Sequence, residues 1–314
     1  KESVSYVRYN SDGFRGPDEY ITPPPDSVLR IAILGDSDAE GNVVDYEYVS
    51  GRVLEVLLNE YFRDDKHEKY RRAEVIKAGV YSYEPCQFLR FFEERVLKYQ
   101  PEVVLVLHNE KFADDVFCNL DDGKLYYEDM SYTRLEYLVR YVLGYVKGKS
   151  QLVNYLYRFY RFTLGGDARL PEKLHEGMFR YGSPKIEDSK IIDDKATPSL
   201  NKYKNLPETP INQAPLTYHQ RLMRAVYQRF NQVVIAYGGK LRIVVLGPTD
   251  KDSNNSILGE LMEQADIPIF DLNSYIRDRK TEDISFKLNG HWNEYGHFIA
   301  GKGLFDVVTK LEIQ

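Results

Sequence analysis

The chain has 314 residues, enough for one large domain or for one domain with an insertion. It carries 42 basic and 48 acidic residues, and a net charge of -6 with mixed signs argues against a nucleic-acid-binding protein. Its two cysteines, Cys86 and Cys118, form no CxxC pair, so they predict neither a disulfide framework nor a zinc site, and either suits a small buried position. No run approaches the roughly 20 apolar residues of a membrane span.

The sequence begins at Lys1 rather than Met. We therefore expect a natural segment before Lys1, and an export signal or a membrane anchor in that segment would place the protein outside the cytoplasm. Localisation and oligomeric state are left open at this point.

The first part of the chain predicts a regular alternation of strands and helices. Residues 1–27 are polar and end in a proline run, which predicts an extended segment that packs on the core. Strands are predicted at Leu29–Leu34, Glu74–Lys77 and Glu102–His108, with amphipathic helices at Tyr46–Phe62 and Glu84–Tyr99 between them. This order predicts a parallel sheet with helices on both faces.

The alternation stops between residues 116 and 215. Leu135–Leu164 has aromatic and apolar residues at helical spacing, which fits either a cap over the sheet or an ordinary packed insertion. The pattern then resumes with predicted helices at Tyr218–Tyr237, Ile257–Ala265 and Trp292–Leu311 and strands at Leu241–Leu246 and Pro268–Leu272. We therefore predict an N-terminal segment 1–27 and a single α/β domain 28–314 that contains a helical and loop insertion at 116–215.

A serine lies just past the carboxyl end of the first predicted strand, in Gly35-Asp36-Ser37-Asp38. Open α/β sheets place their active sites at this edge, although Asp and Ser here could also simply cap a helix. A histidine near the other end of the chain, in Asn289-Gly290-His291, favours the functional interpretation. A serine hydroxyl needs a base that takes its proton before it can attack, and an imidazole can serve as that base.

Several blocks in chain order carry a family resemblance. They are Asn10-Ser11-Asp12-Gly13-Phe14-Arg15-Gly16-Pro17, Gly35-Asp36-Ser37, the strand that ends at Gly79, the strand Glu102–His108 with its following loop, and Asn289-Gly290-His291. With them the chain resembles the SGNH (GDSL-type) hydrolase superfamily, in particular bacterial members with an N-terminal NSxGFRGP segment. The resemblance implies a flavodoxin-like three-layer α/β/α sandwich with a central parallel sheet.

The resemblance also implies a chemistry. It points to a serine esterase that cleaves or transfers an O-linked acyl group through an acyl-enzyme, with no metal and no cofactor. Ser37 would be the nucleophile and His291 its base, while the backbone N–H groups of Ser37 and Gly79 and the side chain of Asn109 would bind the oxyanion. Glycine suits position 79 because a backbone amide that approaches a substrate closely leaves no room for a Cβ. The implied substrate is a small-molecule or glycan acyl ester, and the 26 tyrosines hint at sugar binding, although tyrosine is also ordinary core material.

Two positions depart from the family pattern. The family usually has an acid two or three residues before the histidine, where this chain has Asn289 and Leu288. An asparagine can hydrogen-bond the imidazole but offers no charge to stabilise the imidazolium. A gap-free alignment also puts Glu110 rather than Asn109 at the oxyanion position, where a carboxylate would repel the developing charge. The alternative prediction is therefore a degenerate, catalytically inactive SGNH domain that binds a glycan or a protein partner.

The remaining acidic and histidine candidates have simpler interpretations. Glu282, Asp283 and Glu294 could replace the missing acid, but a surface charge is the usual explanation for such residues. His297 does not have zinc-helix spacing from the first histidine, so we interpret it as structural. His108 ends a strand near the predicted site, and we interpret it as a buried, hydrogen-bonded histidine.

A second enzyme class can be drawn from the same turn. Asp36 and Asp38 have the spacing of the two aspartates of haloacid-dehalogenase-type phosphatases. Glu40, however, stands where those enzymes carry Thr or Val, and the Gly79 and His291 blocks would have no role. We therefore favour the serine-based interpretation.

Overall fold

The structure is a computed structural model that describes residues 5–65, 68–109, 117–121, 124–127, 216–246, 258–259, 261–263, 265–276, 279–288 and 290–312. The chain divides into two compact units, Lys1–Tyr127 with Ile191–Gln314, and Glu128–Lys190. All described residues belong to the first unit, which is presented here by itself. Most of the predicted insertion 116–215, including Leu135–Leu164, lies outside the described residues and stays a prediction.

Five parallel strands form the central sheet in the order β2-β1-β3-β6-β7. They are β1 (Val28–Gly35), β2 (Arg72–Gly79), β3 (Val103–Asn109), β6 (Lys240–Leu246) and β7 (Ile269–Asp271). The first strand lies inside the sheet, and the chain winds outward from it in both directions, which is the flavodoxin-like order. The predicted fold class is therefore confirmed. Because the strands are parallel, β1, β2, β3 and β6 all end at one edge of the sheet.

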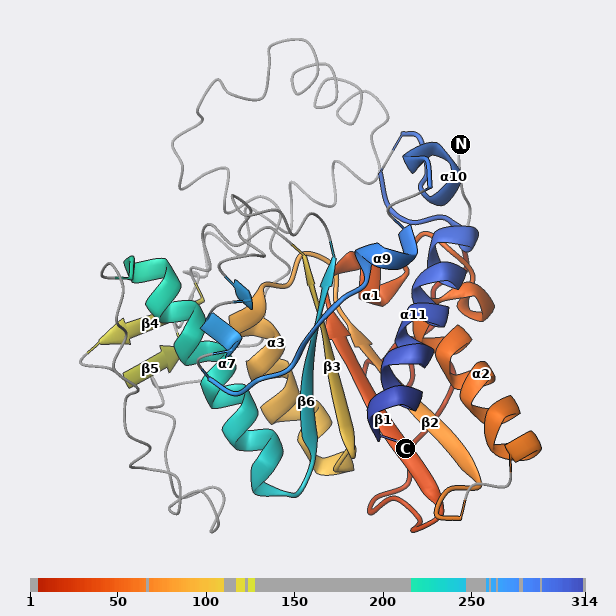
Figure 1. The fold of residues 1–314 in the computed structure, drawn as a ribbon, viewed down its shortest axis with the longest axis horizontal. Helices are drawn as coiled ribbons and strands as arrows, with labels where there is room; N and C mark the ends of the chain where they lie inside the picture. The colour runs from red at the N-terminus through yellow and green to blue at the C-terminus, as the bar shows by residue number, and fades with distance from the viewer. Residues whose placement is uncertain are drawn as a thin grey trace. The chain divides into compact units, whose positions relative to one another are not determined.

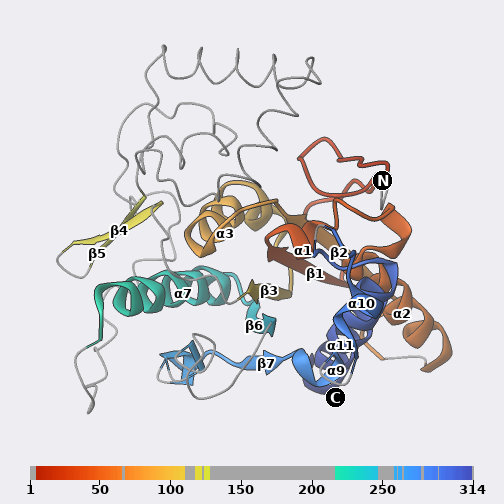
Figure 2. The same ribbon diagram turned by 90° about the horizontal axis from the view of Figure 1, so that it is seen from above.

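Helices cover both faces of this sheet, as Figures 1 and 2 show. One face carries α2 (Ser50–Asp65) and the closing helix α11 (Glu294–Glu312), and the other carries α3 (Pro85–Phe91) and α7 (Tyr218–Ala236). Two buried cores correspond to the two faces. Strands β1 and β3 are buried on both sides, which explains their continuous apolar sequences.

Two predicted helices differ from the observed ones. The predicted helix Tyr46–Phe62 is split into a short 3-10 helix η1 (Tyr46–Tyr48) and α2, because Val49 adopts an extended backbone that buries its side chain completely. The predicted helix Glu84–Tyr99 begins as α3 but continues as a π-helical turn η2 (Phe92–Val96) and a 3-10 turn η3 (Leu97–Tyr99). The closing helix begins and ends close to its predicted limits.

A short antiparallel hairpin, β4 (Cys118–Asp121) and β5 (Lys124–Tyr127), was not predicted from the sequence. A disulfide joins its first residue, Cys118, to Cys86 in α3, with a Cα–Cα distance of 5.8 Å. The expectation that the cysteines form no disulfide is therefore wrong. Their separation of 32 residues matches no recognisable pattern, so only the three-dimensional arrangement reveals the pair.

The N-terminal segment covers the edge of the sheet at β2. The Arg15 amide donates to the Lys77 carbonyl at 2.9 Å, and the Tyr20 hydroxyl donates to the Val75 carbonyl at 2.8 Å. Phe14 is buried under this segment with its ring against Tyr20. An edge strand left bare would offer unpaired backbone groups, and the segment supplies donors to two carbonyls of β2.

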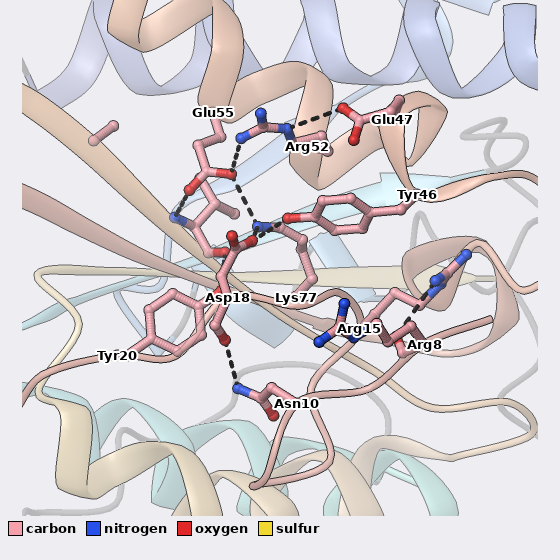
Figure 3. Close-up of polar contacts among 12 residues, drawn as sticks. Arg8, Asn10, Arg15, Asp18, Tyr20, Tyr46, Glu47, Arg52, Glu55 and Lys77 are labelled. Atoms are coloured by element: carbon pink, nitrogen blue, oxygen red, sulfur yellow. Dashed lines mark hydrogen bonds and ion pairs between the residues drawn. The ribbon is translucent and has the colours of Figure 1, made fainter. Parts of the chain in front are cut away.

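A cluster of charged groups fastens the segment to β2 (Figure 3). The fully buried ammonium of Lys77 lies 2.9 Å from Glu55 in α2 and 3.2 Å from Asp18 in the N-terminal segment. Arg52 contacts the same Glu55 carboxylate at 3.0 Å, and the Tyr46 hydroxyl hydrogen-bonds Asp18. Burial would raise the pKa of Asp18, but the hydrogen bond from Tyr46 and the charge of Lys77 hold it below its usual range.

In the described part of the chain, no helix is long and apolar enough to cross a bilayer.

Candidate active site

Ser37 lies where β1 meets the short helix α1 (Ser37–Glu40). Gly35 makes the turn possible, because a Cβ at this residue would lie 2.7 Å from the Ala39 side chain and 3.0 Å from the Leu107 carbonyl. Asp36 caps the helix, with its carboxylate accepting the Asp38 amide at 3.1 Å. The serine is therefore held by a rigid, buried strand at the carboxyl edge of the sheet.

His291 lies on a turn between the short helix α10 (Thr281–Ile284) and α11. Its carbonyl accepts the Phe286 amide at 2.8 Å, and the next turn of the chain is tied down by the Asn293 amide, which donates to the Ile284 carbonyl at 2.9 Å. Gly290 supplies the left-handed backbone, with φ at 74°, that the turn requires. These bonds fix the main chain on either side of the imidazole.

The two side chains meet although they are 254 residues apart in the sequence. The Oγ atom of Ser37 lies 2.9 Å from Nε2 of His291, and both residues are half-buried. They face a cavity of about 280 Å³. The cavity is lined by Asp36, Ser37, Tyr81, Ser82, Tyr83, Glu84, Pro85, Phe88, His108, Asn109 and His291. A hydroxyl and an imidazole at hydrogen-bond distance can act as a nucleophile and its base, and they lie at the edge where α/β sheets place their sites.

The end of β3 supplies another wall of this cavity. His108 is fully buried, and its Nδ1 atom lies 2.9 Å from the Tyr227 hydroxyl. Burial lowers the pKa of His108 to about 3, so its imidazole is neutral at physiological pH. Asn109 follows it, is half-buried and lines the cavity with Ser37. Asn109 and Ser37 thus share one cavity, and the oxyanion role of Asn109 stays a prediction.

Gly79 has a packing role at the end of β2. It ends β2 but does not line the cavity, and a Cβ at this position would lie 2.3 Å from the Glu40 amide nitrogen and 2.5 Å from the Ala39 carbonyl carbon. The missing Cβ lets the backbone of α1 pack directly on the end of β2. The packing of α1 on β2 therefore requires glycine here, and the predicted role of the Gly79 amide as an oxyanion donor stays a prediction.

The turn after Gly79 is the part of the site that the motifs did not indicate. The Tyr83 amide donates to the Val80 carbonyl at 3.1 Å, and Ser82 has φ at 59°, a conformation that non-glycine residues rarely adopt. The half-exposed ring of Tyr81 is tilted by 35° against His291, with 6.3 Å between ring centroids. The one sequence signal for this turn is its position between the end of β2 and Pro85, which begins α3.

The two departures from the family pattern, Asn289 and Glu110, lie outside the described residues, so their predicted effects stay predictions. Glu282, Asp283 and Glu294 are all exposed, as expected for surface charges.

His297 is buried, and its Nδ1 atom accepts the Ser50 amide at 3.4 Å. Burial lowers the pKa of His297 to about 3. Its hydrogen bond inside the fold agrees with the structural interpretation. Among the described residues, no group of three or more His, Cys, Asp and Glu side chains could hold a metal ion.

Comparison with known proteins gives structural matches. No family model and no curated protein matches the chain. A catalytic mutant of an acetylxylan esterase from Geobacillus stearothermophilus matches with a TM-score of 0.44 and 8% identity, over 92% of this chain and 97% of that one. A lipolytic protein of the G-D-S-L family from Desulfitobacterium hafniense matches with a TM-score of 0.41 and 12% identity, over 89% and 99%. A two-domain esterase active on acetylated mannans matches with a TM-score of 0.43 and 10% identity, over 91% of this chain and 50% of that one.

Proposed function

We propose that the chain is a serine hydrolase or acyltransferase of SGNH type that acts on an O-linked acyl ester through Ser37 and His291. The observation that carries this proposal is the 2.9 Å contact between Ser37 Oγ and His291 Nε2 at the mouth of a cavity. A helix cap would explain Asp36 and Ser37 without any neighbouring base, whereas a serine nucleophile requires a base within hydrogen-bond reach, and His291 can be that base.

The proposed reaction has two halves. Ser37 Oγ attacks the ester carbonyl carbon while His291 Nε2 takes the hydroxyl proton, and the carbonyl oxygen becomes an oxyanion. The amides of Ser37 and Gly79 and the Asn109 side chain are the proposed oxyanion donors. The intermediate collapses to an acyl-serine, and His291 returns the proton to the departing alcohol. Water or an acceptor hydroxyl then attacks the acyl-serine and loses its proton to His291. The acyl–Oγ bond breaks, His291 returns that proton to Ser37 Oγ, and the acid or the new ester is released.

The alternative is a domain of the same fold that binds an acylated glycan or a partner without turnover. The sequence feature that favours it is Asn289, which gives the imidazolium no charge partner at the usual position. On this view Ser37 and His291 would be retained as polar contacts for a ligand. The two functions differ in one measurable property, the reactivity of the serine.

Covalent labelling tests the proposal. Purified protein is treated with a fluorophosphonate ester, and adducts are measured by intact mass. We expect one adduct on the natural sequence, none on Ser37→Ala or His291→Ala, and an unchanged adduct on Ser274→Ala, which removes an exposed serine hydroxyl that does not line the cavity. Acetylated glycans and small aryl esters are then assayed for turnover. A folded protein without an adduct would contradict the hydrolase and favour the binding domain.

A further inference from the structure

Glu40 is a buried acidic residue whose position next to the site is unexplained by the reaction. It ends α1, three residues after Ser37, and only 5% of its surface is exposed. A carboxylate held out of water is costly unless its oxygens are hydrogen-bonded. Both oxygens of Glu40 have donors, and these donors come from two different parts of the molecule.

The first donor is in the cavity wall. The Tyr81 amide donates to Glu40 Oε2 at 2.9 Å. Tyr81 is the second residue of the turn Val80–Tyr83, and the ring of Tyr81 lies against His291. In the same turn, Ser82 has a left-handed backbone conformation. A non-glycine residue keeps such a conformation only where its surroundings hold it. The amide bond to Glu40 is one such restraint on the turn.

The second donor is in the N-terminal segment. The Tyr9 hydroxyl hydrogen-bonds Glu40 Oε1. Burial and the neighbouring carboxylate raise the pKa of Tyr9 above its usual value, so this hydroxyl stays protonated and remains a donor. Tyr9 is anchored in turn by the segment that covers β2, where the Gly16 amide donates to the Arg8 carbonyl at 2.8 Å.

Gly79 makes this arrangement possible. The close approach of its Cα to the backbone of Ala39 and Glu40 brings the end of α1 onto the end of β2. This packing places Glu40 where its side chain reaches the amide of Tyr81, two residues beyond the strand. The same short helix thus presents the serine to the cavity and a carboxylate to the cavity wall.

We propose that Glu40 is a positioning residue that makes the N-terminal segment part of the active site. By binding the Tyr9 hydroxyl and the Tyr81 amide at once, its carboxylate holds the turn Val80–Tyr83 against His291. Glu40 does not touch the substrate, and its effect is transmitted through the main chain of Tyr81. The effect on reactivity rests on the proposed function of Ser37, whereas the restraint on the turn does not.

Three variants separate the two bonds. Glu40→Ala removes both acceptors. Tyr9→Phe removes only the bond to the N-terminal segment. Glu40→Gln can keep both bonds, because its amide oxygen accepts from Tyr81 and its amide nitrogen can donate to the Tyr9 hydroxyl oxygen. The matched controls are Asp306→Ala and Tyr275→Phe, which break another tyrosine–carboxylate bond, 2.5 Å long, that involves no residue of the cavity.

Two measurements are made on each folded variant: amide hydrogen exchange of the peptide that contains Val80–Tyr83, and the rate constant of fluorophosphonate labelling. In Glu40→Ala we expect the amide exchange rate of this peptide to rise roughly tenfold and the labelling rate constant to fall roughly tenfold. A change of this size corresponds to the loss of one charge-assisted hydrogen bond. Glu40→Gln should restore both quantities, Tyr9→Phe should lie between, and the controls should match the natural protein. A merely structural role would lower the melting temperature without slowing the labelling of folded protein.

The outcomes separate the two proposals. If the natural protein carries no adduct, the proposed hydrolase fails, and hydrogen exchange alone decides on the restraint. If Glu40→Ala folds and its exchange and labelling equal those of the natural protein, the role of Glu40 is overturned. If Glu40→Ala does not fold, Tyr9→Phe decides, and exchange unchanged from the natural protein overturns the link to the N-terminal segment.

Discussion

Replacing Gly79 by alanine tests the geometry on which the site depends. The added Cβ would lie 2.3 Å from the Glu40 nitrogen, whereas ordinary contacts begin at 3.4 Å, so α1 and β2 must separate by roughly 1 Å. The obstacle is backbone, which cannot rotate away as a side chain can. We expect a loss of stability of about 1–3 kcal/mol, as for other overpacked sites. A movement of roughly 1 Å of α1 also displaces Ser37 Oγ from His291, and we expect labelling to fall roughly 100-fold.

Urea unfolding and fluorophosphonate labelling measure the two effects on the same preparation. Gly259→Ala is the matched control, because a Cβ there meets nothing within 4 Å. If glycine were needed at position 79 for the approach of a substrate, Gly79→Ala would lose turnover with its unfolding free energy unchanged. A variant that is as stable and as reactive as the natural protein would refute the packing argument altogether.

Three further predictions concern the framework. Lys77→Met should lower the unfolding free energy by about 3 kcal/mol, because it leaves Glu55 buried beside one remaining cation. In a double-mutant cycle measured by urea unfolding, adding Glu55→Gln to that variant should recover at least about 1 kcal/mol. Strictly additive losses would contradict this coupling. Burial lowers the pKa of His297 to about 3, so the unfolding free energy contributed by its neutral form is present above the unfolded pKa of about 6.5 and is lost as the pH falls toward 3. His297→Gln should reduce the slope of this loss by up to about 1.4 kcal/mol per pH unit. An unchanged slope would argue against a neutral imidazole in the native protein. Replacing Cys86 and Cys118 by alanine should lower the unfolding free energy by about 3–4 kcal/mol, as expected for a disulfide between cysteines 32 residues apart. Equal stability with and without the disulfide would show that it does not constrain the unfolded chain.

The sheet could be predicted because its signal is local. The apolar runs Leu29–Leu34, Glu102–His108 and Leu241–Leu246 lie within strands β1, β3 and β6 or extend past one of them by a single residue. Pro101 and Gly238 follow the ends of η3 and α7, as their sequence positions predicted. Helix interiors were harder, because the break at Val49 is decided by the burial of that side chain against distant residues and not by its neighbours in the sequence.

The site divides in the same way. Ser37 and His291 could be proposed from short motifs, and the structure brings them within 2.9 Å of each other. Glu40 and Tyr81 could not, because each looks unremarkable in sequence and gains its place only from packing at Gly79. Buried charges such as Lys77 were also missed, since a lysine in a strand predicts an exposed side chain unless its partners are known.

The single disulfide has a practical consequence for probe chemistry. It uses Cys86 and Cys118, which are the two cysteines of the chain and are only 1% and 4% exposed. The folded protein therefore presents no thiol to maleimide reagents. A cysteine introduced at an exposed position such as Tyr6 would be the one reactive site on the chain. Fluorescent or spin labels can then report from the N-terminal segment without removing a natural residue of the core.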